Sequence, residues 1–168
     1  MGGLAVPEEV LAGQQQYYRE RAAEYDEWWE RRGRYDRGPA ENQVWFDEAV
    51  SVRAAFDAAE LGGEVLELAG GTGNWTLYLA RRARDVTVLD GSPEMLAINR
   101  ARLQDAGLAE RVTYARADLF AWQPERQYDA VFFGFWLSHV PAERLTRFFD
   151  AVAAALRPGG TLAVIDSR

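Results

Sequence analysis

Residues 64–76 read EVLELAGGTGNWT, in which an apolar run leads directly into a glycine-rich turn and then a helical segment. The run 65–69 predicts a buried strand, and 76–84 predicts the helix after the turn. Glycine lets the backbone pass close to a ligand, and the amino end of a helix presents free N–H groups. The turn therefore predicts a ligand site at the end of a strand, with a purely structural turn as the alternative.

The same alternation of strand and helix continues to the end of the chain. Further strands are predicted at 86–89, 111–115, 128–133 and 161–165, with helices over 92–106 and 141–156 and a turn at 157–160. Each strand is a continuous apolar run, as expected where both faces of a parallel sheet are covered. The pattern predicts an α/β fold with a doubly wound parallel sheet.

Upstream of residue 61 the pattern is helical instead. Apolar residues recur at helical spacing over 8–32 and 41–60, and the second segment places Val44, Trp45 and Phe56 on one face. We expect two parts, a helical extension over 1–60 that serves as a lid and an α/β core over 61–168.

Composition excludes several classes of function. The chain has 168 residues, a net charge of −7, no cysteine, no lysine and one histidine. The acidic balance argues against nucleic acid, and the missing residues exclude disulfides, thiolate chemistry and Schiff bases. No apolar run approaches a membrane span, and no secretory signal precedes the chain, so we expect a cytoplasmic protein.

Acidic residues follow three of the predicted strands or lie within them. Glu67 precedes the glycine turn, Asp90 ends the second predicted strand and Asp118 follows the third. A carboxylate in the position of Asp90 can accept both hydroxyls of a ribose, and Asp118 can accept a bond from an adenine amino group. Each could instead be a solvated loop residue or a helix cap.

Two nucleosides fit this arrangement. A nicotinamide dinucleotide requires G-x-G-x-x-G, but Thr76 stands where the third glycine would lie. A charge on Glu67 would repel a pyrophosphate and would favour a cationic ligand with an amino group. The contrast favours a sulfonium nucleoside.

The motifs resemble those of the class I S-adenosylmethionine-dependent methyltransferases. The first family motif is an acidic residue followed by G-x-G-x-G, and here Ala69 replaces the first glycine. We expect that replacement to be tolerated if position 69 keeps a negative φ. YDAVFFGFWLSHVP (128–141) is similar to the fourth strand and its loop, and LRPGGTLAVIDS (156–167) to the motif that leads into the fifth strand.

The resemblance implies a Rossmann-like sheet of order 3-2-1-4-5, with S-adenosylmethionine as cofactor and S-adenosylhomocysteine as product. YYRERAAEYDEWW (17–29) is also similar to the amino-terminal helix of the small-molecule and quinone or lipid branches, in which the tyrosine matching Tyr25 lines the cofactor pocket. Simple aromatic packing is the alternative there. The implied cofactor-binding residues are Tyr25, Glu67, Ala69, Gly70, Gly71, Gly73, Asp90, Gly91, Met95, Asp118, Leu119, Phe133 and Gly134.

Residues after the fourth strand point to the substrate. We expect His139 to contact the substrate or act as general base, with helix capping as the alternative. Phe135, Trp136, Trp28 and Trp29 suggest an apolar or planar small molecule, with core packing as the alternative. The loop lacks the (D/N)-P-P-Y of amide and nucleobase N-methyltransferases, and it lacks the acidic ligand of magnesium-dependent enzymes, so we expect no metal.

Family members continue past the fifth strand with a helix and antiparallel strands, which we expect to be missing here. The apolar edge 161–165 then predicts a homodimer or another edge-mediated association. The leading interpretation is methyl transfer to a small-molecule acceptor by in-line displacement, with an O, N or C acceptor left open. A non-catalytic methyltransferase-like module and a nicotinamide-dependent reductase are the alternatives.

Overall fold

The protein is described from a computed structural model, which covers residues 24, 26–59 and 61–166. The expectations for Tyr25 and for most of the predicted helix 8–32 lie outside the described residues.

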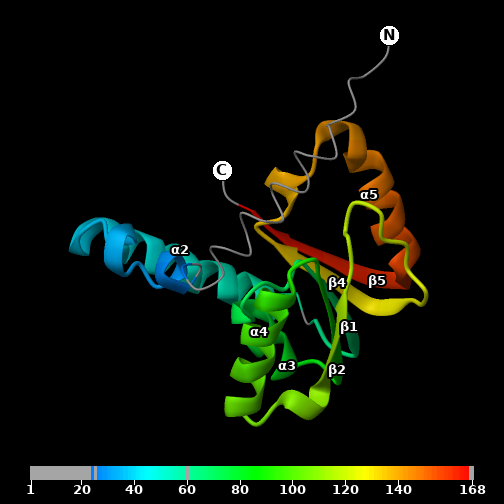
Figure 1. The fold of residues 1–168 in the computed structure, drawn as a ribbon, viewed down its shortest axis with the longest axis horizontal. Helices are drawn as coiled ribbons and strands as arrows, with labels where there is room; N and C mark the ends of the chain where they lie inside the picture. The colour runs from blue at the N-terminus through cyan, green and yellow to red at the C-terminus, as the bar shows by residue number, and fades with distance from the viewer. Residues whose placement is uncertain (1–23, 25, 60, 167–168) are drawn as a thin grey trace.

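A five-stranded parallel sheet forms the centre of the molecule (Figure 1). Its order is β3-β2-β1-β4-β5, which confirms the order that the resemblance implied. Because the chain winds outward from β1 in one direction and from β4 in the other, the carboxyl ends of these two strands are the topological switch point of the sheet. The strands are β1 (Glu64–Leu68), β2 (Asp85–Asp90), β3 (Val112–Arg116), β4 (Tyr128–Gly134) and β5 (Leu156–Ile165).

Helices cover both faces of the sheet. Helices α3 and α4 lie on one side and α5 on the other (Figure 1). Helix α4 is capped by Ser92, whose Oγ accepts a hydrogen bond of 3.2 Å from the N–H of Met95. The helices are α2 (Pro39–Ala58), α3 (Asn74–Ala80), α4 (Pro93–Asp105) and α5 (Ala142–Ala155), with 3-10 turns at Gly33–Tyr35, Ala109–Arg111 and Leu137–His139.

Alternation along each strand divides the core into two layers. Val65 packs with Leu79 of α3 and Leu103 of α4, whereas its neighbour Leu66 packs on the opposite face with Val152 of α5. Successive strand residues point to opposite faces, so one continuous apolar run supplies both layers. The continuous runs noted in the sequence therefore reflect a sheet that is buried on both sides.

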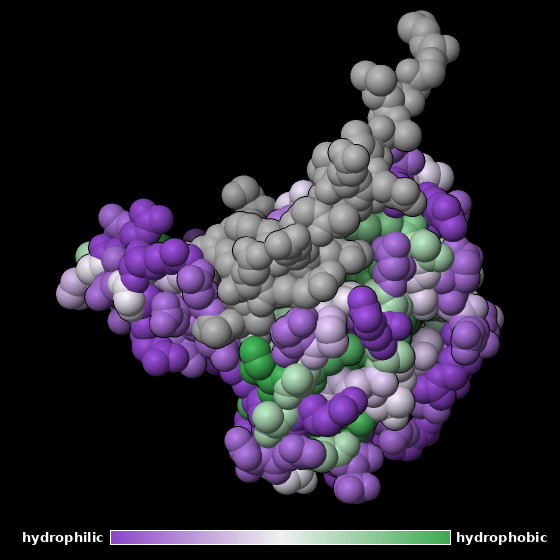
Figure 2. Space-filling model, viewed as in Figure 1, coloured by the Kyte–Doolittle hydropathy of each residue, from purple (hydrophilic) through white to green (hydrophobic). Residues whose placement is uncertain are grey.

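Helix α2 is the element that departs most from its prediction. It buries only Phe56 fully, and Trp45 is half-buried, but Val44 is 59% exposed, so the prediction that Val44 shares their face was wrong. The helix extends well beyond the sheet (Figure 1), and the face of this part that is seen in Figure 2 is largely hydrophilic, although α2 also exposes Val44, Phe46 and Val50. None of the helices in the described part of the chain is long and apolar enough to cross a membrane.

Strand β5 begins earlier than predicted. The expected turn 157–160 is the irregular start of this strand, because the register jumps between the pairs Tyr128–Leu156 and Ala130–Thr161. Such a bulge adds residues on one strand without breaking the pairing. β5 lies at the edge of the sheet, where Leu162 and Val164 are 38% and 41% exposed.

Candidate active site

Backbone strain gathers at the carboxyl ends of β1 and β4. Ala69, directly after β1, has a φ of +54°, and Phe135, directly after β4, has a φ of +55°. The negative φ at position 69 under which we expected alanine to be tolerated in place of glycine is therefore not found. A left-handed conformation costs a residue with a side chain about 1–2 kcal/mol, and such strain concentrates at functional sites. Both strained residues lie at the switch point of the sheet, where open α/β sheets bind ligands.

The glycines of the turn have different surroundings. A Cβ at Gly70 would lie 2.4 Å from Val88 Cγ1, and one at Gly73 would lie 2.7 Å from Asn99, so these two glycines allow the turn to pack on β2 and α4. A Cβ at Gly71, whose φ is +53°, would have no neighbour within 4 Å among the residues that the structure describes. Gly71 is therefore the point at which a ligand can approach the backbone of the turn.

Asp90 lies beside that point, as predicted. Its Oδ2 accepts a hydrogen bond of 2.9 Å from the N–H of Gly71, and its Oδ1 accepts one of 2.8 Å from the N–H of Ser92. Burial raises the pKa of Asp90, and the bonds from Ser92 and Gly71 oppose the rise. Each carboxylate oxygen can accept more than one bond, so Asp90 can hold the turn and still bind hydroxyl groups.

Glu67 is placed differently from the expectation. Its side chain is buried beneath the turn, where Oε2 accepts a hydrogen bond of 2.5 Å from Thr76 Oγ1. Burial raises the pKa of Glu67 to about 8, with a smaller contribution from the charge of Asp90. The raised pKa favours the neutral acid at pH 7, and in that form Glu67 would neither repel a pyrophosphate nor attract a cation.

A buried polar chain extends from Glu67 to β3, and the sequence analysis missed it. Asn99 Nδ2 donates to Thr76 Oγ1 at 2.7 Å, and the Tyr114 hydroxyl donates to Asn99 Oδ1 at 3.0 Å. Burial raises the pKa of Tyr114 to about 12. The hydroxyl of Thr76, where the dinucleotide fingerprint would need glycine, is the central link of this chain.

The remaining predicted cofactor residues fall into two groups. Asp118 is exposed beyond β3, where its Oδ1 accepts a 2.9 Å bond from the N–H of Phe120. Gly91 lies at the same edge, since a Cβ there would be 3.5 Å from the carbonyl oxygen of Ala117. By contrast, the side chains of Met95, Leu119 and Phe133 are buried, and those of Leu119 and Phe133 belong to the core.

An aromatic wall, formed by Trp28, Trp29, Trp45, Trp75 and Phe135, stands beside the end of β4. The ring centroids of Trp28 and Trp29 lie 5.4 and 6.1 Å from that of Phe135, and Trp29 is 5.7 Å from both Trp45 and Trp75. The structure thus brings three of the four predicted substrate residues together, from segments more than one hundred residues apart in the sequence.

Trp136, the fourth predicted substrate residue, lies in a separate cluster. Its ring is 5.2 Å from Phe120 and 6.4 Å from His139. Burial lowers the pKa of the half-buried His139, and the charge of Asp166 opposes the change. The lowered pKa favours the neutral imidazole, which is the form that acts as a base.

A buried donor at the switch point tests whether a ligand fits there. Trp75 is 7% exposed, and its indole N–H has no hydrogen-bond acceptor among the described residues. It lies 3.5 Å from the position of a Cβ at Gly134, at the carboxyl end of β4. A buried donor without an acceptor is costly, so an acceptor on a ligand at this edge would fit the residues present. The open face of Gly71 and the acceptor oxygens of Asp90 fit a nucleoside in the same way.

The sheet order, the glycine turn and the acid that ends β2 define a Rossmann-like nucleotide-binding domain. A family model described as a methyltransferase domain matches residues 65–160. The chain belongs to this family, that of the class I S-adenosylmethionine-dependent methyltransferases.

Individual relatives agree with the family. A ubiquinone/menaquinone biosynthesis C-methyltransferase UbiE from Methylococcus capsulatus is 39% identical over 120 residues, which make up 68% of this chain and 48% of the relative. The chain thus spans about half the length of the curated relatives it matches. A solved structure titled DhpI-SAM-HEP complex is 39% identical with a TM-score of 0.78, over 96% of this chain and 68% of the other. The glycopeptide N-methyltransferase MtfA in complex with S-adenosylmethionine is 27% identical with a TM-score of 0.59, over 68% and 52%.

Proposed function

We propose that the chain binds S-adenosylmethionine and transfers its methyl group to a small-molecule acceptor. The observation that carries this proposal is the pairing of Asp90 with the open Gly71 at the switch point, next to the aromatic wall. Relatives of the same family support it, because they are named as methyltransferases or were solved with S-adenosylmethionine or S-adenosylhomocysteine.

Three residues would hold the nucleoside. Asp90 would accept the ribose hydroxyls, Gly71 would admit the ligand to the backbone of the turn, and Asp118 would accept a bond from the adenine amino group with its remaining oxygen. When bound, the cofactor supplies a methyl group that its sulfonium already activates. The remaining task of the protein is to position the acceptor, exclude water and remove a proton where the acceptor carries one.

The acceptor is proposed from the aromatic wall. The rings of Trp28, Trp29 and Phe135 meet edge to face at the end of β4, and such a surface favours a planar or largely apolar molecule. The names of the relatives include a quinone C-methyltransferase and a glycopeptide N-methyltransferase. We therefore favour a quinone-like ring as the acceptor. Turnover assays with candidate acceptors would identify the atom that is methylated.

His139 is proposed as the proton acceptor. It is half-buried and its pKa is lowered. It is the last residue of the 3-10 turn that comes shortly after β4. We expect His139→Ala to lower kcat and to remove an acidic limb from its pH profile. Unchanged turnover and substrate affinity in that variant would exclude the role.

Calorimetric titration with S-adenosylhomocysteine tests the proposed cofactor, with NADH as the control ligand. We expect binding of S-adenosylhomocysteine only, and a large loss of affinity in Asp90→Asn. Asp85→Asn is the matched control, because Asp85 begins the strand that Asp90 ends. A folded protein that does not bind S-adenosylhomocysteine would contradict the proposal. Binding without turnover on a panel of quinols and other small acceptors would favour a non-catalytic module.

Self-association through β5 is the last part of the proposal. This edge strand exposes Leu162 and Val164, and unprotected apolar edges pair with other chains. We expect a dimer by light scattering and a monomer after Val164→Lys. A monomeric wild-type protein would contradict the dimer.

A further inference from the structure

A polar cluster joins the amino-terminal segment to the glycine turn. We call it the Asp26 cluster, and it consists of Asp26, Thr72, Asn74 and Arg102. Thr72 Oγ1 donates to Asp26 Oδ1 at 2.7 Å, and Arg102 donates to Asp26 Oδ2 at 2.5 Å. Asn74 Nδ2 lies 3.3 Å from Asp26 Oδ1, and Arg102 also donates to Asn74 Oδ1. One carboxylate thus connects residues 26–29, the turn and helix α4.

The contacts of Asp26 act on the most adaptable part of the site. Thr72 and Asn74 flank Gly73, whose φ is +91°, and Thr72 follows Gly71 directly. Glycines leave a free turn many backbone conformations. Side-chain bonds on both neighbours of Gly73 restrict that choice before any ligand arrives, and preorganisation of this kind raises affinity.

The same helical segment also carries the aromatic wall. Trp28 and Trp29 follow Asp26 within one helical turn, and their rings contact Phe135 at the end of β4. The indole N–H of Trp45 donates to the carbonyl oxygen of Trp29 at 3.1 Å, which ties α2 to the same segment. A shift of Asp26 away from Thr72 would therefore move the wall as well as release the turn.

The geometry points to Asp26 as a positioning residue that couples the conformation of the glycine turn to the position of the aromatic wall. The inference rests on the proposed function, since the turn is where the nucleoside would bind and the wall is where the acceptor would lie. Asp26 itself need not touch either molecule. Its bonds to charged and neutral donors are of the strong, charge-assisted kind, and Asp26 and Arg102 are only 23% and 22% exposed.

Two variants test the role of the cluster. Asp26→Asn removes the charge that faces Arg102, and we expect S-adenosylhomocysteine to bind about 3- to 30-fold more weakly, with acrylamide quenching the tryptophan fluorescence of the ligand-free protein more strongly. Thr72→Val should reproduce both changes. Thr72→Ser keeps the hydroxyl, so its affinity and its quenching should be those of the wild type. The control is Asp57→Asn, which changes an aspartate of α2 that pairs with Arg82, just after α3, at a more exposed position.

Melting followed by circular dichroism separates positioning from simple stabilisation. A lower Tm with unchanged affinity and unchanged quenching would overturn the inference, because Asp26 would then only stabilise the fold. Equal binding by wild type and Asp26→Asn would also overturn it. A wild-type protein that binds no S-adenosylhomocysteine is a different result, which contradicts the proposed function, and the quenching comparison then still tests whether Asp26 holds the wall.

Discussion

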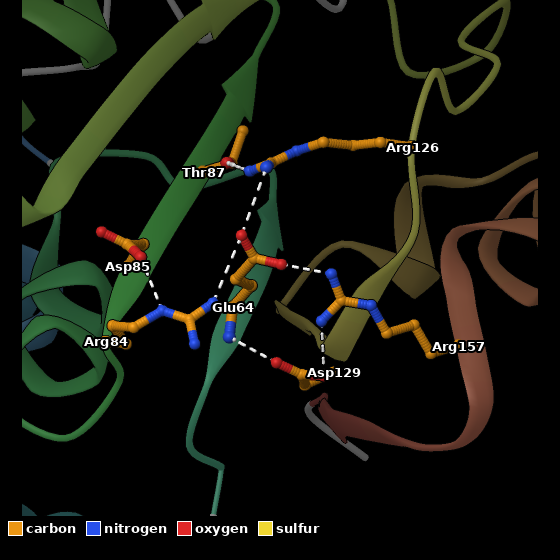
Figure 3. A network of polar contacts seen from close by, with 7 residues as sticks. All are labelled: Glu64, Arg84, Asp85, Thr87, Arg126, Asp129 and Arg157. Carbon is orange, nitrogen blue, oxygen red and sulfur yellow. Dashed lines mark hydrogen bonds and ion pairs between the residues drawn. The ribbon is translucent and has the colours of Figure 1, made fainter.

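The two ends of strand β1 place the same residue type in opposite environments. At the amino end, Glu64 pairs with Arg157 and lies 3.4 and 3.5 Å from Arg84 and Arg126, and its backbone N–H donates to Asp129 at 2.8 Å (Figure 3). The hydrogen bond from Arg157 is the main reason that the pKa of Glu64 is lowered. Charges at this edge of the sheet are fully paired.

At the carboxyl end, Glu67 has no cation beside it among the described residues. It is buried, bonds to Thr76 and has a pKa of about 8. Two strained residues, Ala69 and Phe135, and the unpartnered indole N–H of Trp75 share this end of the sheet. Backbone strain and shifted pKa values concentrate at functional sites. The amino edge of the sheet therefore serves stability, whereas the carboxyl edge carries features that cost stability and that are typical of a binding site.

Two glycines offer the largest test of that difference. A Cβ at Gly63, whose φ is +70°, would lie 2.2 Å from Asp129 Oδ2 at the amino edge, whereas one at Gly71 would have no described residue within 4 Å. We expect Gly63→Ala to lower the free energy of unfolding by about 2–5 kcal/mol, from the left-handed backbone and the overlap together. Gly71→Ala should cost only about 1–2 kcal/mol and yet abolish binding of S-adenosylhomocysteine.

Urea denaturation and calorimetric titration on the two glycine variants measure both effects. Equal losses of stability, or retained binding in Gly71→Ala, would remove the distinction between the two edges.

The next prediction concerns Glu67 and pH. The folded protein keeps this proton up to about pH 8, whereas an unfolded glutamate loses it near the ordinary value of 4.5. The stability from protonated Glu67 is therefore complete below about pH 4.5 and is lost as the pH rises toward 8. Glu67→Gln should raise the free energy of unfolding by on the order of 1–3 kcal/mol at pH 7–8 and leave it nearly unchanged at pH 4.5.

Denaturation at several pH values checks the Glu67 prediction, with Glu64→Gln as control. The pKa of Glu64 is lowered, so its contribution is present above its unfolded pKa and is lost only as the pH falls. Glu64→Gln should therefore destabilise the protein at neutral pH. A Glu67→Gln protein that is less stable than wild type at pH 7 would contradict the assignment of a buried neutral acid.

A smaller effect is expected from Arg157, which bonds to both Glu64 and Asp129. The pKa values of both carboxylates are lowered, so their share of the stability is lost as the pH falls below about 4. Arg157→Met should lower the Tm at pH 6–7, and the difference from wild type should narrow toward pH 3. Because these side chains are partly exposed, the shift should stay below that of Glu67→Gln. A difference that widens on acidification would contradict this account, and Arg81→Met is an exposed control.

The sequence was most informative where a residue acts through its place on a strand. Continuous apolar runs predicted all five strands, and the place of Asp90 at the end of the second one predicted its position beside the turn, because both features depend on local order along the chain. The pKa of Glu67 and the contacts of Asp26 depend on residues that meet only in three dimensions. Thr76 lies nine residues from Glu67, and Arg102 lies seventy-six from Asp26. The strand that contains Glu67 was predicted correctly, but the burial of its side chain was not. No sequence pattern indicated a role for Asp26.

The smallest predicted effect concerns Ala69, which stands where the family has glycine and which adopts a positive φ. Its φ of +54° costs about 1–2 kcal/mol, and glycine would remove that strain but would add about 0.4–1 kcal/mol of entropy to the unfolded chain. Ala69→Gly should thus raise the free energy of unfolding by about 0.5 kcal/mol. Ala54→Gly, on the exposed face of α2, should instead lower it by about 1 kcal/mol, because glycine is a poor helix former. The opposite signs would show that the carboxyl edge holds strain that an ordinary alanine position lacks, whereas equal losses would mean that the turn after β1 is relaxed and that its departure from the family's glycine carries no cost.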